Sequence, residues 1–122
     1  MKRLVLAGVT VATVLGVAMS ANAQSGDGQC VRTQFLRNHT VGDNHTLYFD
    51  YDGRDVVKLT TSGNCLAAVT SSDPIVLKDR SAGQICKPID WDIRVRGIPC
   101  MVTGMTKLTP AEVAALPKGK RP

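Results

Sequence analysis

Four cysteines spread through a short chain limit the folds that this sequence can adopt. They stand at Cys30, Cys65, Cys86 and Cys100. Their number is even, and no two are close enough in sequence to form a C-x-x-C redox or zinc motif. In an oxidising compartment this pattern predicts two structural disulfides, which would stabilise a domain too small to rely on its hydrophobic core alone.

The N-terminal segment has the features of a secretory signal peptide. A lysine and an arginine precede an uncharged apolar run over residues 4–19, and an Ala-Asn-Ala sequence ending at Ala23 supplies the small side chains that a signal peptidase requires. We therefore expect residues 1–23 to be removed and the mature protein to act in the periplasm or outside the cell. Glycine and threonine dilute the apolar run, so an uncleaved anchor is disfavoured and no stable membrane span is expected after processing.

The pairing of the cysteines is open at this stage, because four cysteines allow three connectivities. We favour Cys30–Cys100 together with Cys65–Cys86. The reason is that Cys65 and Cys86 flank one central segment, whereas Cys30 and Cys100 each open a terminal strand. In the chain-entropy description, such loops add roughly 3 and 4 kcal/mol to the free energy of unfolding.

The charge distribution argues against a nucleic-acid partner. The formal net charge is +5, but two positive charges belong to the predicted signal peptide. The remaining excess lies in a basic tail at residues 118–122, which we expect to be a solvated end. Residues 24–117 carry ten basic and ten acidic residues, and the aromatic side chains do not lie among clustered basic residues, as they would in a nucleic-acid-binding surface.

Period-two alternation of apolar and polar residues dominates the mature chain, and helical periodicity is almost absent. The alternation predicts short strands at residues 31–35, 47–51, 56–59, 75–77, 93–95 and 100–108. Residues 38–44 are predicted to form a polar turn, and residues 97–99 a second turn. Asp52-Gly53 predicts a type I′ hairpin turn, because both central positions of that turn need a positive φ.

These elements predict an all-β fold, a small antiparallel barrel or sandwich of about six short strands, stapled by disulfides. A short C-terminal helix follows, since Thr109 is a good N-cap, Pro110 a good first residue, and Glu112 can reach back to the cap. The helix can continue only to Leu116, before a proline. The expected organisation is a signal peptide at 1–23, a single β domain at 24–117 and the basic tail at 118–122.

The order of motifs around the cysteines resembles a known family. The first cysteine opens the domain, a hairpin precedes Gly-Asn-Cys-Leu around Cys65, the third cysteine precedes an Asp-containing turn, and the fourth opens a strand that ends in Leu-Thr-Pro-Ala-Glu. Residues 30–112 thereby resemble small exported proteobacterial proteins known only as a domain of unknown function. The resemblance implies export and disulfides, and it supplies no activity and no catalytic residues.

No arrangement of acids, bases or nucleophiles indicates an enzyme. No serine lies in a G-x-S-x-G sequence. His39 and His45 are expected to be exposed loop residues, because no third metal ligand accompanies them. The hairpin from Asp50 to Asp55 faintly resembles a calcium loop, but its glycine falls at the wrong position and no bidentate glutamate follows. No metal and no cofactor are expected.

Trp91, between Asp90 and Asp92, is the residue with the strongest claim to ligand binding. Exposed, its ring could stack on a sugar while the two acids bind hydroxyl groups. Buried, it would anchor the small core, which is the reading we favour for a single tryptophan.

Two classes of function follow. We expect a non-enzymatic exported module that binds or shields a component of the cell envelope, because no acid, base and nucleophile converge. The alternative is a small hydrolase or an inhibitor-like ligand binder, with a cleft between the Asp50 to Asp55 hairpin and the turn that carries Trp91.

Overall fold

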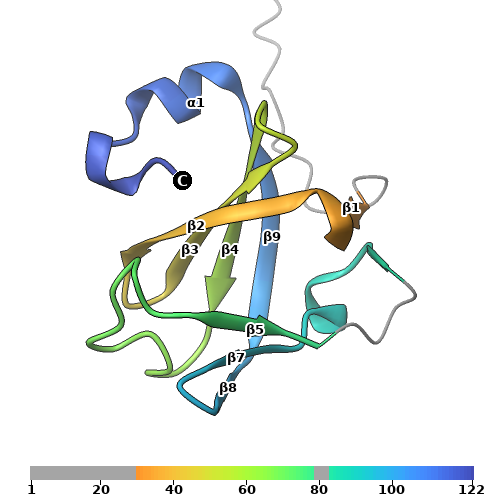
Figure 1. Ribbon diagram of the computed structural model, residues 1–122, viewed down its shortest axis with the longest axis vertical. Helices are drawn as coiled ribbons and strands as arrows, with labels where there is room; N and C mark the ends of the chain where they lie inside the picture. Colours follow the sequence, from red (N-terminus) through yellow and green to blue (C-terminus); the bar gives the residue numbers. More distant parts are fainter. Residues whose placement is uncertain (1–29, 79–82) are drawn as a thin grey trace, which may run out of the picture.

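The computed structural model describes residues 30–78 and 83–122, so the predicted signal peptide at residues 1–23 lies outside the described part. The described chain is mostly β-structure, with one short α-helix near the C-terminus (Figure 1). The strands are β1 (Val31–Arg32), β2 (Leu36–Asp43), β3 (Thr46–Tyr51), β4 (Asp55–Thr61), β5 (Ile75–Leu77), β6 (Gln84–Ile85), β7 (Ile93–Val95), β8 (Ile98–Cys100) and β9 (Val102–Leu108). The helical elements are α1 (Pro110–Ala115) and the 3-10 turns η1 (Thr33–Phe35), η2 (Pro88–Asp90) and η3 (Lys118–Lys120).

The strands form three antiparallel sheets. A four-stranded sheet has the order β2-β3-β4-β9, a three-stranded sheet has the order β5-β7-β8, and β1 pairs with β6. Met101 alone separates β8 from β9, so one stretch of chain passes from the three-stranded sheet into the four-stranded sheet. The predicted all-β antiparallel fold with a short C-terminal helix is confirmed, although the strands are more numerous than expected.

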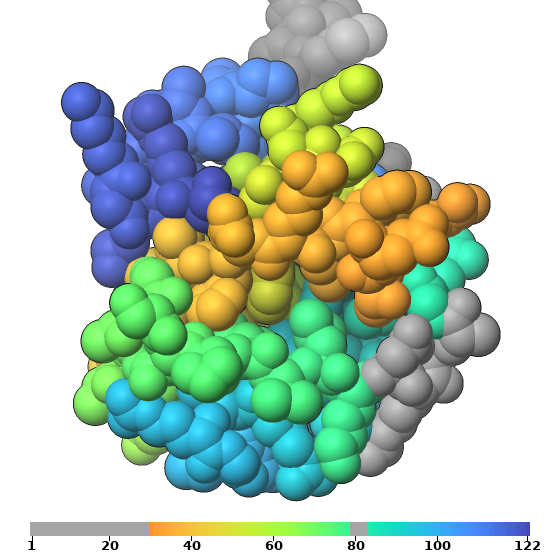
Figure 2. All heavy atoms as spheres, in the orientation of Figure 1, coloured from red at the N-terminus to blue at the C-terminus, as the bar shows by residue number. Residues whose placement is uncertain are grey.

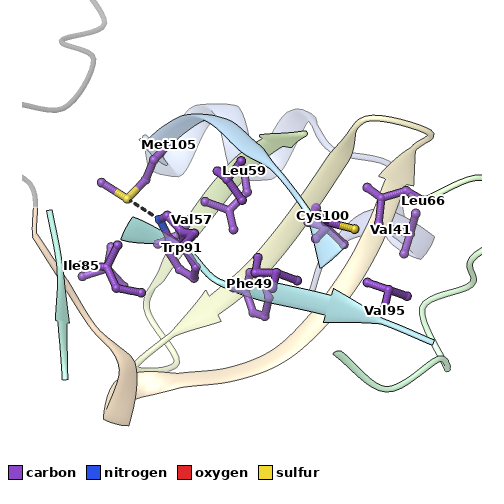
Figure 3. Close-up of a cluster of buried hydrophobic side chains, with 14 residues drawn as sticks. Val41, Phe49, Val57, Leu59, Leu66, Ile85, Trp91, Val95, Cys100 and Met105 are labelled. Carbon is purple, nitrogen blue, oxygen red and sulfur yellow. Dashed lines mark hydrogen bonds between the residues drawn. The ribbon is translucent and has the colours of Figure 1, made fainter. Parts of the chain in front are cut away.

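One hydrophobic core lies between the sheets. Phe49 and Leu59 enter it from the four-stranded sheet, and Ile93 and Val95 enter it from the three-stranded sheet. Trp91 lies in the same cluster, as Figure 3 shows. These strand residues alternate with partly or fully exposed neighbours, because successive side chains of a strand point to opposite faces.

Two tight turns with consecutive residues of positive φ close hairpins in the two larger sheets. Asp52 and Gly53 have φ values of 58° and 71°, and the N–H of Arg54 donates to the carbonyl of Tyr51 at 3.3 Å. This is the predicted type I′ turn between β3 and β4. The second turn consists of Arg96 and Gly97, with φ values of 52° and 77°.

The prediction of a turn at residues 97–99 is wrong in its register. Ile98 pairs with Val95 and Pro99 pairs with Arg94, so both belong to β8. Pro99 is tolerated there because β8 is an edge strand, where a missing N–H breaks no ladder hydrogen bond.

Two predictions at the start of the domain are also wrong. Most of residues 38–44 lies in β2, and only Asn44 and His45 form the turn to β3. The polar composition is that of an edge strand with solvated side chains, and Val41 supplies the buried position. The first predicted strand, at residues 31–35, ends at Arg32 and continues as the 3-10 turn η1.

The four cysteines form two disulfides, as predicted, but the favoured pairing is wrong. The bonds are Cys30–Cys86 and Cys65–Cys100. The reason is the pairing of β1 with β6: Val31 lies opposite Ile85, which brings Cys30 beside Cys86.

The C-terminal segment, residues 109–122, forms a strap across the outer face of the four-stranded sheet; we call it the C-terminal strap. It begins as predicted, since the Thr109 hydroxyl accepts the N–H of Glu112 at 3.2 Å. Further along, α1 contacts β9 and η3 contacts β2, which are the two edge strands of this sheet. Val56, on the face opposite the core, is buried.

The basic tail makes fixed contacts with the domain, although Lys118 and Arg121 are exposed to solvent. The ammonium group of Lys120 donates to the carbonyl of Val41 at 2.9 Å, and the hydroxyl of Thr40 donates to the carbonyl of Lys120. The guanidinium of Arg121 donates to the carbonyls of Leu116 and Ala114. Main-chain acceptors on β2 and α1 hold the tail, and sequence composition does not reveal them.

Candidate functional site

The outer face of the three-stranded sheet carries a strip of exposed apolar side chains around one arginine. Val76 on β5, Arg94 on β7 and Pro99 on β8 lie side by side in register. Met101 follows on the same side as Pro99, because Cys100 between them is buried. We call Val76, Pro99 and Met101 the apolar strip; Val76 is 53% exposed and Met101 70% exposed.

This strip lies in the part of the molecule that the C-terminal strap leaves uncovered. Figure 2 shows the β5 and the β7–β8 segments together at the surface, away from the α1 segment. Among the described residues, the large hydrophobic side chains that are exposed all lie between positions 76 and 101; they are Val76, Ile89, Ile98 and Met101. Val76 and Met101 belong to the apolar strip, whereas Ile89 lies on η2 and Ile98 pairs with Val95. Exposed apolar side chains that lie together, unlike single ones, often mark a binding surface.

Arg94 lies at the centre of the strip, on the middle strand of the sheet. Its side chain is partly buried, and its Nε atom is buried without a hydrogen-bond partner among the described residues. A buried donor without an acceptor costs about 1–3 kcal/mol.

The edge of β8 is closed to an incoming strand. In a hairpin with a two-residue turn, Val95 and Ile98 form the hydrogen-bonded pair next to the turn. The backbone of the following residue, Pro99, therefore faces away from β7, and proline has no N–H to offer. A strand added at this edge of β8 would therefore lack one ladder hydrogen bond.

A network of polar contacts holds the turn at the end of β7 and β8. The Arg96 guanidinium makes a bidentate contact with Asp73, with Nη2 at 3.0 Å and 3.1 Å from the two carboxylate oxygens. The same carboxylate accepts the N–H of Thr70 at 2.7 Å. Mainly because of this backbone hydrogen bond, and further because of Arg96, the pKa of Asp73 lies below its ordinary value.

Asp73 also connects the strip to the other large sheet. Nε2 of His39 on β2 donates to the carbonyl of Asp73 at 2.9 Å, and Ser71 accepts the N–H of Val41 at 3.0 Å. The Cys65–Cys100 disulfide attaches β8 to the segment that follows β4. The strip is thus held on both sides by contacts within the domain.

Trp91, the predicted ligand-binding residue, lies in the core. It is 4% exposed, its ring stacks on Phe49 with centroids 6.0 Å apart, and its indole N–H donates to Sδ of Met105 at 3.1 Å (Figure 3). The favoured interpretation, a core anchor, is what the structure shows. The alternative hydrolase or inhibitor-like function thereby loses the exposed aromatic side chain on which it was based.

The acids around Trp91 and in the first hairpin have local contacts. Asp90 and Asp92 are partly exposed on either side of Trp91, and their part in ligand binding stays a prediction. The Asp50 carboxylate accepts the N–H of Gly53 at 3.0 Å, and Asp52 lies 3.8 Å from the Arg37 guanidinium. These contacts stabilise a turn.

The two histidines have separate environments. His39 is partly buried, with its ring 5.9 Å from that of Phe49, whereas His45 is exposed and its N–H donates to the Asp43 carboxylate. The expectation that both are exposed loop residues is therefore wrong for His39, which belongs to β2. Within residues 30–78 and 83–122, no three His, Cys, Asp or Glu side chains are grouped to hold a metal ion.

The residues of the strip were not singled out by the sequence. The available signal was the alternation along β7 and β8. It places Arg94 opposite to Ile93 and Val95, and it places Met101 on the same side as Arg94 once Pro99 is assigned to the strand.

Comparison of the chain with protein-family models, curated proteins and solved structures gave no match. In the part of the chain that the structure describes, no helix has both the length and the apolar character needed to span a bilayer. The function must therefore be argued from the surface and its residues.

Proposed function

We propose that this protein is an exported, non-enzymatic binding module that holds a protein component of the cell envelope on the outer face of its three-stranded sheet. The observation that carries the proposal is the apolar strip around Arg94. The C-terminal strap contacts both edge strands of the four-stranded sheet, whereas this face presents exposed apolar side chains around a partly exposed arginine.

The composition of the strip favours a protein partner. Methionine and arginine are enriched at protein interfaces, and aliphatic side chains around a partly desolvated cation are typical of an interface centre. A polypeptide also offers carbonyl and carboxylate oxygens that can pair with the partly exposed guanidinium group of Arg94. Because the strip spans three short strands, we expect an interface at the small end of the range, below about 1,200 Å².

Two further features support an exported protein. Both disulfides would be reduced in a typical cytoplasm, whereas the periplasm keeps them oxidised. The signal peptide predicted at residues 1–23 would deliver the chain to that compartment. Location in the periplasm or outside the cell is part of the proposal.

Site-directed photo-crosslinking in the producing cell tests the proposal. A photoreactive amino acid at position 76 should give one discrete protein adduct in the envelope fraction. The same probe at Asn44, which is exposed in the turn between β2 and β3, serves as the matched control and should give none. Met101→Asp should abolish the adduct at position 76, whereas Met101→Leu should preserve it.

Three results would overturn the proposal. The first is an equal pattern of adducts from positions 76 and 44. The second is concentration-dependent dimerisation of the purified domain that Met101→Asp abolishes, which would make a second copy the occupant. The third is binding of the purified domain to anionic phospholipid vesicles with the same sensitivity, which would assign the strip to a lipid surface.

A further inference from the structure

The mature chain contains two methionines whose thioethers have opposite environments. The other two, Met1 and Met19, belong to the predicted signal peptide. Met101 is 70% exposed in the apolar strip, whereas Met105 is 5% exposed in the core. The sulfur of Met105 accepts the indole N–H of Trp91 at 3.1 Å.

We propose that Met101 is a site of reversible oxidation, and that its sulfoxide weakens the binding of the partner to the apolar strip. The oxidants are peroxides or hypohalous acids. The weakened binding rests on the proposed function. The selective oxidation of Met101 over Met105 rests on the different exposure of the two thioethers.

The chemistry needs an oxidant that reaches a sulfur lone pair. With hydrogen peroxide, the sulfur attacks one peroxide oxygen, the O–O bond breaks, an S=O bond forms and the remaining oxygen leaves as water. The sulfur loses two electrons and the peroxide gains them. Met101 is open to this attack, whereas the sulfur of Met105 is enclosed and one of its lone pairs is engaged by Trp91.

The product would change the surface without disturbing the fold. A sulfoxide turns a flexible apolar side chain into a polar one, which disfavours its burial against a partner. The backbone at this position keeps its contact, in which the N–H of Ser62 donates to the carbonyl of Met101 at 3.0 Å. Enzymes of the methionine sulfoxide reductase class restore the thioether, so the change is reversible.

Trp91 provides an internal monitor of selectivity. It is the only tryptophan of the chain, and its indole is bonded to the buried Met105. Oxidation of Met105 would break this hydrogen bond and insert a polar oxygen into the core, which would change the fluorescence of Trp91. Oxidation of Met101 would leave the fluorescence unchanged.

The selectivity is tested with the mature, disulfide-bonded domain treated with hydrogen peroxide. Both methionines lie between Arg96 and Lys107, so fragmentation of a single tryptic peptide assigns each sulfoxide. We expect Met101 to be oxidised at least about tenfold faster than Met105, without a change in Trp91 emission. Met101→Leu should remove the fast phase and leave the slow one. Equal rates, or a fluorescence change that accompanies the first oxygen, would overturn the inference.

The consequence is tested through the photo-crosslink at position 76. Peroxide treatment should reduce the adduct at least about threefold when Met101 is present. Treatment of the oxidised wild-type protein with a methionine sulfoxide reductase should then restore the adduct. An undiminished adduct with Met101 fully oxidised would overturn the switch while leaving the proposed function intact. No adduct before oxidation would overturn the proposed function instead, and the rates of the two methionines would still decide the selectivity.

Discussion

The two large sheets of this protein are stabilised by different means. The strands of the four-stranded sheet are six to eight residues long, and its faces are covered by the core on one side and the C-terminal strap on the other. The strands of the three-stranded sheet have three residues each. Neither disulfide has a cysteine in the four-stranded sheet, whereas Cys100 belongs to β8.

The contrast shows how a small domain can keep one face available for binding. Long ladders and two covered faces let the four-stranded sheet support itself. Strands of three residues bury too little surface for that, so the Cys65–Cys100 disulfide and the Asp73–Arg96 contact hold the β5-β7-β8 sheet in place. Its outer face then needs no covering element, and the strip remains accessible.

The largest effect should come from removal of a disulfide. Replacing Cys65 and Cys100 together by alanine opens a loop of 35 residues. In the chain-entropy model this lowers the free energy of unfolding by about 4 kcal/mol. Urea unfolding at equilibrium measures the loss.

The strands that lose protection from hydrogen exchange show whether the two sheets are stabilised by different means. In the variant without Cys65 and Cys100, hydrogen exchange should show lost protection in β7 and retained protection in β3 and β4. Equal losses in both sheets would contradict the idea that the four-stranded sheet supports itself.

A substitution in the core should lower the free energy of unfolding almost as much as loss of the disulfide, because it removes packing contacts. Leu59 on β4 is fully buried, so Leu59→Ala should lower the free energy of unfolding by about 2–5 kcal/mol through lost transfer energy and a cavity. Ile98→Ala on the exposed edge of β8 is the matched control and should cost less than about 0.5 kcal/mol. A comparable loss for both variants would mean that Ile98 is packed.

The two hairpin turns should respond alike, although they lie in different sheets. Gly53→Val and Gly97→Val both place a β-branched residue at positive φ, where a Cβ finds room but the backbone is strained. We expect each to cost about 1–3 kcal/mol in thermal or urea unfolding.

Asp52→Asn should be nearly neutral, because asparagine favours the first central position of this turn as well as aspartate does. It also tests the calcium interpretation. If calcium raises the melting temperature of the wild-type protein and Asp52→Asn abolishes the rise, the turn is a ligand site and our structural account of it fails.

The sequence predicted the features that depend on neighbouring residues. Asp52-Gly53 specifies its own turn, and Thr109 with Pro110 and Glu112 specifies the start of α1, since both signals act within a few residues. The class of fold followed from strand alternation, which is also local.

The features that were missed depend on contacts between distant segments. The Cys30–Cys86 disulfide follows from the pairing of Val31 with Ile85. No pattern in the sequence predicts that pairing. The docking of Lys120 on β2 depends on a free main-chain carbonyl at Val41. The apolar strip likewise exists only once β5 and β8 flank β7.

The smallest expected effect is on the stability of the folded state at acidic pH. It concerns one aspartate contact near each of the two sheets. The pKa of Asp73 is lowered by the N–H of Thr70 and by Arg96, and that of Asp43, the last residue of β2, is lowered chiefly by the N–H of His45. A carboxyl whose pKa is lower in the folded state adds stability above its unfolded pKa of about 3.9, and this stability is lost as the pH falls through the folded pKa.

Asp73→Asn should therefore reduce stability at neutral pH and make the decline of stability below about pH 4 shallower than in the wild-type protein. Asp43→Asn should act in the same direction, because its carboxylate is held by the same kind of backbone contact. Only the Asp73 variant should also increase hydrogen exchange in β7 and β8, since Asp73 is bonded to the turn between them through Arg96. Urea midpoints measured between pH 2.5 and 7, together with exchange at neutral pH, decide this. If stability declines below about pH 4 as steeply in the Asp73 variant as in the wild-type protein, the contact of Asp73 with Thr70 and Arg96 does not stabilise the three-stranded sheet.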